Sequence, residues 1–181
     1  MGNYKKKIRV LLPPSTFYNK IQDLENPRDR AYNILLYYLG CRCTEGRNLT
    51  FEDITHDPDQ ERILIQIHRL KGSKQTPPNP LYFDSPFIHE LKDYLLGDRM
   101  GKIFPFCRAT AYTVVKNNMG WYPHYYRMNR FSQFAQSGKG FNAIRNWFGV
   151  GLDTIDYYMV ELELQDMGKG LKWRNKIHAS T

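Results

Sequence analysis

The sequence predicts a single α+β domain that is mainly α-helical and contains one small antiparallel sheet. Apolar residues recur at helical spacing over most of the chain, which indicates several amphipathic helices. One short stretch differs: Ile63, Ile65 and Ile67 occupy every second position, as in a half-buried strand, and Gly72-Ser73 follows them as a hairpin turn. The length of 181 residues suits one domain better than two large ones.

Two helices are expected in the first 40 residues, and the second of them has the clearest ends in the sequence. Asn26 is a favourable N-cap for it, Pro27 suits its first turn, and Gly40 is placed to end it. Its apolar face is formed by Ala31, Ile34, Leu35 and Tyr38. A shorter helix is expected before it, with Ser15 or Thr16 as the N-cap.

The sheet is expected to follow a tight connection between helices. Thr44 can cap a further short helix, so Arg42 is expected in the connection before it. Residues 61–69 then predict a strand, and a second strand is expected near residues 81–83.

The second half of the chain is expected to be helical. Ser85-Pro86 is a favourable helix start, and Gly138 and Gly149 are placed to end two later helices. The predicted helices cover residues 86–96, 108–118, 124–136, 141–148 and 153–164.

The composition and charge indicate which class of partner the protein binds. The net charge of +8 favours a polyanion, because neutralising phosphates releases condensed counterions. Basic residues gather in a lead-in (1–14) and a tail (166–181), each of which could equally be a solvated segment. No apolar run approaches the roughly 20 residues of a membrane span, and no signal-like stretch follows the start. A cytoplasmic protein with no membrane contact is therefore expected.

The cysteines predict neither a disulfide framework nor a metal site. Cys41, Cys43 and Cys107 are odd in number, and they lack the spacing and the fourth ligand of a zinc site. Reduced thiols are expected.

Two arginines are candidates for binding a phosphodiester. Negative charge builds on the non-bridging oxygens during attack at phosphorus, and planar guanidiniums match those oxygens. Arg42 and Arg127 could form such a clamp, although an isolated arginine is more often part of a surface salt bridge. His124 is three residues before Arg127, so both are expected on one helix face, where the histidine could donate a hydrogen bond or carry a proton. A helix-capping role is the alternative for His124.

A lysine and a tyrosine would complete a strand-cleaving site. Lys71, at the mouth of the predicted hairpin, could protonate a leaving 5′ oxygen, with Lys74 as its rival; the alternative is a solvated hairpin tip. Tyr158 could attack the phosphorus if nearby positive charge helps the phenol to ionise. Because the chain has 13 tyrosines, a packing role is the alternative for any one of them.

The order of these residues resembles the catalytic domain of the tyrosine recombinases, the phage integrase family. The pattern consists of Gly-x-Arg-x-x-Glu around Arg42, the hairpin lysine, His-x-x-Arg and a tyrosine about thirty residues later, and it covers residues from about 15 to 165. The resemblance implies a role for each residue. Arg42 and Arg127 bind the phosphate, Lys71 is the general acid and Tyr158 is the nucleophile. His124 matches the first histidine of the family pattern, and Glu45 is a supporting carboxylate.

The resemblance also implies a reaction and its partners. DNA strands are cut and rejoined through a 3′-phosphotyrosyl bond, without a metal or nucleotide cofactor. The partner is double-stranded DNA at the nucleoid, on which protomers assemble as a homo-oligomer, a dimer or tetramer. The divergent sequence resembles integrases of archaeal viruses and plasmids, and the family's N-terminal core-binding domain is expected to be absent. The candidate DNA contacts are the basic residues Lys74, Arg130, Lys139 and Arg145.

The sequence departs from the family pattern before the last helix. Gly149-Val150 stands where the family usually has Gly-His or Gly-Trp, and valine cannot donate a hydrogen bond to phosphate. Trp147 and Asn146 are candidates to replace that donor. The spacing to the tyrosine is one residue shorter than in many relatives, which makes Tyr157 a competitor. Two alternatives follow: a non-catalytic DNA-binding protein with this fold, and strand relaxation of the type IB topoisomerase kind.

Overall fold

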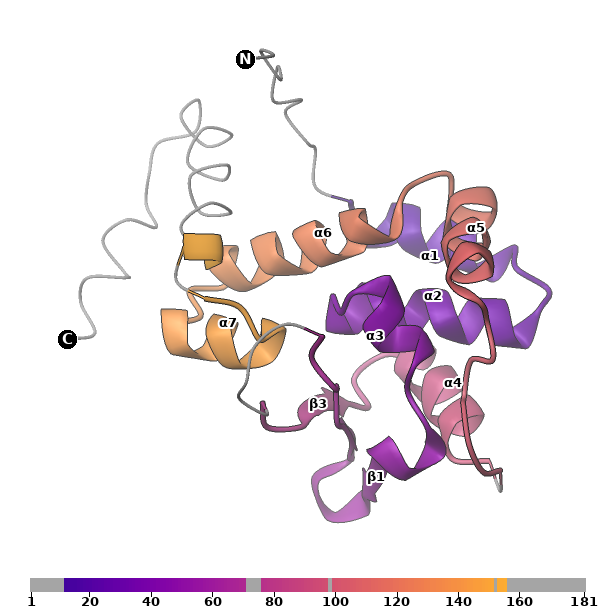
Figure 1. Cartoon of the computed structure of the whole chain (residues 1–181), viewed down its shortest axis with the longest axis horizontal. Coiled ribbons are helices and arrows are strands. Elements are labelled where there is room, and N and C mark those ends of the chain that lie inside the picture. Colours follow the sequence, from indigo (N-terminus) through magenta and orange to yellow (C-terminus); the bar gives the residue numbers. More distant parts are fainter. Residues whose placement is uncertain (1–11, 71–75, 98, 152, 156–181) are drawn as a thin grey trace, which may run out of the picture.

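The computed structural model describes residues 12–70, 76–97, 99–151 and 153–155, and these form a mainly helical domain with a small antiparallel sheet (Figure 1). The predicted fold class is confirmed. The α-helices are α1 (Pro14–Gln22), α2 (Pro27–Leu39), α3 (Cys43–Arg47), α4 (Pro86–Leu95), α5 (Arg108–Met119), α6 (Pro123–Gln136) and α7 (Phe141–Phe148). The strands are β1 (Ile54–Asp57), β2 (Arg62–Ile65) and β3 (Asn79–Tyr82), and two short 3-10 turns, Phe51–Asp53 and Pro58–Gln60, flank β1.

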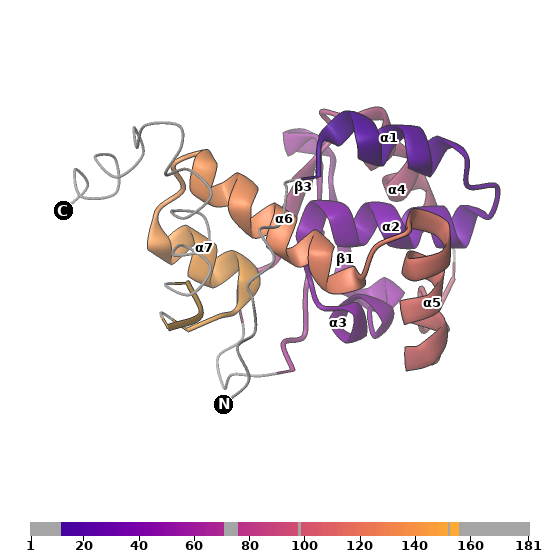
Figure 2. The same ribbon diagram turned by 90° about the horizontal axis from the view of Figure 1, so that it is seen from above.

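Helix α2 lies at the centre of the domain, and its ends and its apolar face agree with the sequence prediction. The side chain of Asn26 accepts hydrogen bonds from the backbone N–H groups of Arg28 and Asp29, at 3.0 and 3.3 Å. Gly40 ends the helix in the left-handed conformation, with φ of 60°. Residues 31–39 are all buried, because α2 packs against five other helices, α1 and α3 to α6. Figure 2 shows α2 between α1 and α3.

The sheet has three antiparallel strands in the order β1-β2-β3, one more than the sequence prediction contained. Ile63, Ile65 and Ile67 are buried, which confirms the predicted alternation. Strand β1 was missed because its residues are exposed or only half-buried, so no apolar period marks it. Strand β3 begins at Asn79 rather than near residue 81. As an edge strand it accommodates Pro80, whose missing N–H would weaken a central strand.

Helix α6 joins two apolar clusters. Tyr126, near its start, is part of the main core, whereas the residues one turn later pack against α7 in a second cluster. The second cluster contains Met128, Phe131, Ala135, Ile144, Phe148, Val150 and Ile155. Arg127 lies in α6 between residues of the two clusters, and it is buried, with 2% of its surface exposed. The junction of the two clusters therefore holds a buried cation.

Two predicted helix starts are wrong by two or three residues. Helix α1 has Pro13 as its N-cap, ahead of Ser15 and Thr16. Helix α3 has Arg42 rather than Thr44 as its N-cap, because the carboxylate of Glu45 reaches back and accepts the Arg42 backbone N–H at 2.8 Å. The predicted helix from Asp153 lies mostly outside the described residues. None of the helices in the described ranges is long and apolar enough to cross a membrane.

Candidate active site

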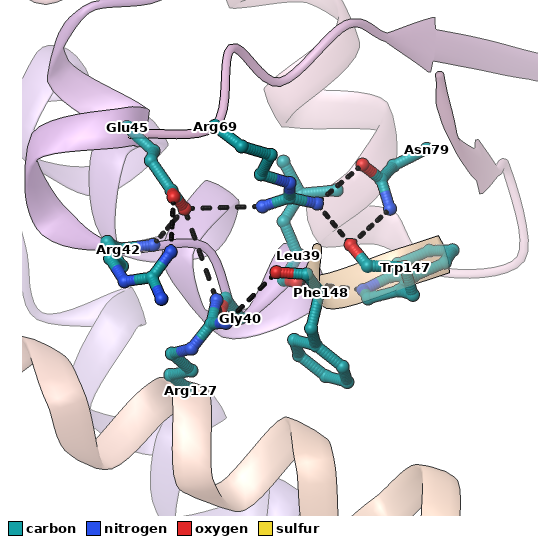
Figure 3. A network of polar contacts seen from close by, with 9 residues as sticks. All are labelled: Leu39, Gly40, Arg42, Glu45, Arg69, Asn79, Arg127, Trp147 and Phe148. Atoms are coloured by element: carbon teal, nitrogen blue, oxygen red, sulfur yellow. Dashed lines mark hydrogen bonds and ion pairs between the residues drawn. The ribbon is translucent and has the colours of Figure 1, made fainter. Parts of the chain in front are cut away.

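The carboxylate of Glu45 is the centre of a polar network at this junction (Figure 3). Its side chain is fully buried and faces three guanidiniums. Oε1 accepts Nη1 of Arg42 at 2.6 Å, and Oε2 accepts Nη1 of Arg69 at 3.2 Å. Nη1 of Arg127 lies 4.0 Å from Oε2. The network thus joins the N-cap of α3, the segment after β2, and α6.

Charge in this network is unbalanced. Burial alone would raise the pKa of the Glu45 carboxyl, but hydrogen bonds from Arg42 and the charges of Arg69 and Arg42 outweigh burial, so that the pKa lies below its ordinary value. Burial lowers the pKa of Arg69 from its ordinary value, and Glu45 opposes that shift. Among the residues of Figure 3, one carboxylate serves three guanidiniums, so two positive charges are in excess. Such a site favours an anion.

The three arginines differ in exposure. The Arg42 side chain is 31% exposed, whereas those of Arg127 and Arg69 are 2% and 3% exposed. Arg42 is therefore the guanidinium of the three that an incoming anion can reach directly.

Arg127 links the ends of two helices. Its Nη1 donates to the carbonyl oxygen of Gly40 and its Nη2 to that of Phe148, both at 3.0 Å. These carbonyls lie at the C-terminal ends of α2 and α7, where intrahelical donors are lacking and a cation is favourable. Gly40 must stay glycine, because a Cβ there would lie 2.8 Å from Cβ of Arg130 and from Cε1 of Phe148.

Arg127→Lys is expected to destabilise the domain by about 2 kcal/mol, because one ammonium cannot reach both carbonyls and a buried acceptor is left unpaired. The free energy of unfolding from urea titrations measures this change. Arg145→Lys, at an exposed position of α7, is the control and should change it by less than about 0.5 kcal/mol. Equal values for the two variants would contradict the linking role of Arg127.

Arg69 was not among the predicted site residues, yet its guanidinium makes three hydrogen bonds in the network. Its Nη2 donates to Oδ1 of Asn79 at 3.3 Å and to the carbonyl oxygen of Trp147. The sequence contained a signal for this residue. Arg69 follows the three isoleucines at positions 63, 65 and 67 at the same spacing of two, so it is expected on the same buried face. An arginine at such an inward position needs a buried acidic partner, which here is Glu45.

The Gly149-Val150 segment, which departs from the family pattern, lies at the second apolar cluster. Val150 is 7% exposed and packs there, so the usual donor position is occupied by a core residue. Of the two candidates to replace the donor, Trp147 gives its indole N–H to the carbonyl oxygen of Leu39 at 2.8 Å, and Asn146 is exposed.

The remaining predicted residues are only partly described. His124 is exposed near the start of α6, whereas Arg127 on the next turn is buried. Lys71, Lys74, Tyr157 and Tyr158 lie outside the described residues.

Among the expected DNA contacts, Lys139 and Arg145 are exposed. Arg130 is half-buried, donates to Gln133 at 3.0 Å and lies over the ring of Phe134.

The cysteines and acidic residues of the described ranges form no cluster of the kind that binds metals. Cys41, Cys43 and Cys107 are all free thiols. In the part of the chain that the structure describes, no three His, Cys, Asp or Glu side chains are grouped so that they could hold a metal ion.

Solved structures share this architecture, although no protein-family model and no curated protein matches the chain. A XerH site-specific recombinase bound to its difH substrate in a pre-cleavage complex superposes with a TM-score of 0.69 and 19% identity, over 90% of this chain and 53% of that one. XerA recombinase gives 0.64 and 16%, over 92% and 67%. The chain thus spans about half the length of XerH. The described residues have the fold of the tyrosine recombinase catalytic domain.

Proposed function

We propose that this chain is the catalytic domain of a site-specific DNA recombinase that cuts and rejoins strands through a covalent 3′-phosphotyrosyl intermediate. The observation that carries the proposal is the buried network with two excess positive charges, of which Arg42 is open to an incoming anion. A phosphodiester is an anion whose negative charge grows on its equatorial oxygens during attack, and fixed guanidiniums stabilise that charge.

The proposed chemistry assigns one step to each residue. The phenol oxygen of Tyr158 attacks phosphorus while Arg42 contacts the phosphate oxygens and the positive charge of the buried Arg127 helps to neutralise them. The bond to the 5′ oxygen breaks, and Lys71 gives that oxygen its proton. His124 donates a hydrogen bond to the phosphate or moves the phenol proton, and Glu45 holds the arginines. In the reverse direction, a 5′-hydroxyl attacks the phosphotyrosine and releases Tyr158, so no external cofactor is consumed.

Duplex DNA is the proposed partner, and the protein acts as a homo-oligomer on it, in the cytoplasm at the nucleoid. The net charge of +8 supports a polyanionic partner. A structural neighbour, XerH, is bound to its DNA substrate difH. An integrase of a mobile element, from an archaeal virus or plasmid, is the specific form that we propose.

The test is covalent capture of the protein on nicked duplexes. The target sequence is unknown, so the same experiment must also identify it. A duplex library with randomised flanks around a fixed nick is incubated with the wild-type protein and a chelator. Cleavage near the nick releases a short 5′-hydroxyl fragment, so the adduct cannot reseal and survives SDS. We expect adducts whose DNA converges on one sequence. No adduct at any sequence would overturn the enzymatic proposal.

A non-catalytic DNA-binding protein is the second candidate, because Val150 is a packing residue where the family usually has a donor. Enrichment of particular duplexes without adduct would favour it. Relaxation of a supercoiled plasmid without strand exchange would instead favour the type IB topoisomerase reaction.

A further inference from the structure

We propose that Arg69 and Asn79 are positioning residues, which lock the C-terminal end of α7 against the Glu45 network and so orient the segment that leads to Tyr158. The proposal rests on the proposed function for its effect on cleavage. Its structural part, the lock itself, can be tested without DNA.

The lock is a set of partly buried hydrogen bonds that centre on one carbonyl. Nη2 of Arg69 and Nδ2 of Asn79 both donate to the Trp147 carbonyl oxygen, the latter at 3.1 Å (Figure 3). Oδ1 of Asn79 accepts Nη2 of Arg69 at 3.3 Å, so each residue also orients the other. The carbonyl lies in the last turn of α7, where acceptors lack intrahelical donors.

Arg69 connects this carbonyl to the anion-binding part of the site. Its Nη1 donates to Oε2 of Glu45, whose other oxygen holds Arg42. One planar guanidinium therefore spans from the carboxylate that positions Arg42 to the end of α7. A planar fork with fixed donor directions suits this bridge, whereas a lysine ammonium at the same place could not reach all three acceptors.

The backbone after α7 also fits closely against Arg69. A Cβ at Gly149 would lie 2.8 Å from Cγ and 2.9 Å from Cδ and Nε of Arg69, and Gly149 has a φ of +59°. The chain therefore leaves α7 in direct contact with the arginine stem. Gly149 is nine residues before Tyr158 in the sequence.

A positioning role separates Arg69 from Arg42, the arginine that an incoming anion can reach directly. The Arg69 side chain is 3% exposed, against 31% for Arg42, and its two terminal nitrogens already donate to Glu45, Asn79 and Trp147. A displacement of about 1 Å at reacting atoms can cost on the order of 100-fold in rate. Loss of the lock should therefore slow cleavage much more than it weakens DNA binding.

The experiment compares Arg69→Lys, Arg69→Met and Asn79→Ala with the wild type and with Arg62→Lys. Arg62 is the matched control, because it lies on β2 and pairs with Asp57 at 2.8 Å, away from α7. Arg69→Lys and Asn79→Ala keep the net charge, so they separate loss of the lock from loss of a positive charge. Three quantities are measured for each variant: the single-turnover rate of adduct formation on the captured duplex, the affinity for that duplex, and the hydrogen exchange of residues 147–151. The measurements are made at a temperature well below the unfolding midpoint of each variant.

The Arg69 and Asn79 variants are expected to form adduct about 10 to 100-fold more slowly, with affinity within about threefold. Their amides at 147–151 should exchange faster, and Arg62→Lys should change neither quantity. Unchanged exchange in these variants would overturn the lock, and unchanged adduct rates despite faster exchange would overturn the positioning role. A wild type that forms no adduct would refute the proposed function, while the exchange data would still decide whether the lock exists.

Discussion

Tyr158→Phe is expected to abolish the covalent adduct and to leave duplex affinity within about twofold of the wild type. The substitution removes the phenol oxygen that attacks phosphorus and keeps the ring, so the loss in adduct rate should exceed about 1,000-fold. The measurement is SDS-resistant adduct on the captured duplex, with affinity from fluorescence anisotropy of the same duplex without its nick.

Tyr157→Phe is the matched control, since it removes the same atom one residue earlier and should retain adduct formation. Loss of adduct in this variant alone would move the nucleophile to Tyr157, as the shortened spacing after Gly149 allows. Retained adduct in both single variants would remove both tyrosines from the reaction. Thirteen tyrosines are present in the chain, so peptide mapping of the adduct would then identify the nucleophile.

Glu45→Ala is expected to destabilise the domain by about 3 to 5 kcal/mol, the largest stability effect among these predictions. The substitution leaves Arg69 and Arg127 buried without the carboxylate they share, and uncompensated buried charge is costly. It also removes the acceptor of the Arg42 backbone N–H at the start of α3. The free energy of unfolding from urea titration at pH 7 gives the value.

Glu90→Ala provides the control for this prediction. Glu90 pairs with Arg30 at 2.6 Å, but its side chain is 34% exposed, so its loss should cost less than about 1 kcal/mol. If the two variants were destabilised equally, the buried network would not have the stabilising role assigned to Glu45.

The contribution of Glu45 should also depend on pH with a defined sign. Its folded-state pKa is lowered below the ordinary value of 4.5, so the ionised form stabilises the fold. That stabilisation is fully present above about pH 4.5 and is lost as the pH falls through the lower folded-state pKa. The stability difference between the wild type and Glu45→Gln should therefore be constant near neutral pH and shrink in acid. A difference that grows as the pH falls would contradict the lowered pKa.

The helices were predictable because their signals are local. The cap at Asn26, the glycine at position 40 and the apolar period between them act within one helix, and the structure places that helix as expected. Strand β1 was not predictable by the same means. It is stabilised by pairing with β2, from Ile54 opposite Ile65 to Asp57 opposite Arg62, and its own residues carry no apolar period.

The candidate site was predictable in its residue types but not in its geometry. The order of chemical groups along the chain indicated Arg42, Glu45 and Arg127, and the structure brings these three together. Arg69 was missed because it lies outside the motif, and its function in the network depends on a partner 78 positions away, at Trp147.

The sequence by itself determined the helical class, the strand alternation and the order of candidate reactive residues, since each depends on spacing over a few positions. Only the tertiary structure decided which arginine is partly exposed, which are buried, and that Val150 packs into a core. The physical reason is that burial is set by contacts between distant segments. Arg127 reaches Gly40 across 87 positions, and no local pattern records whether a guanidinium meets a carbonyl, a carboxylate or water.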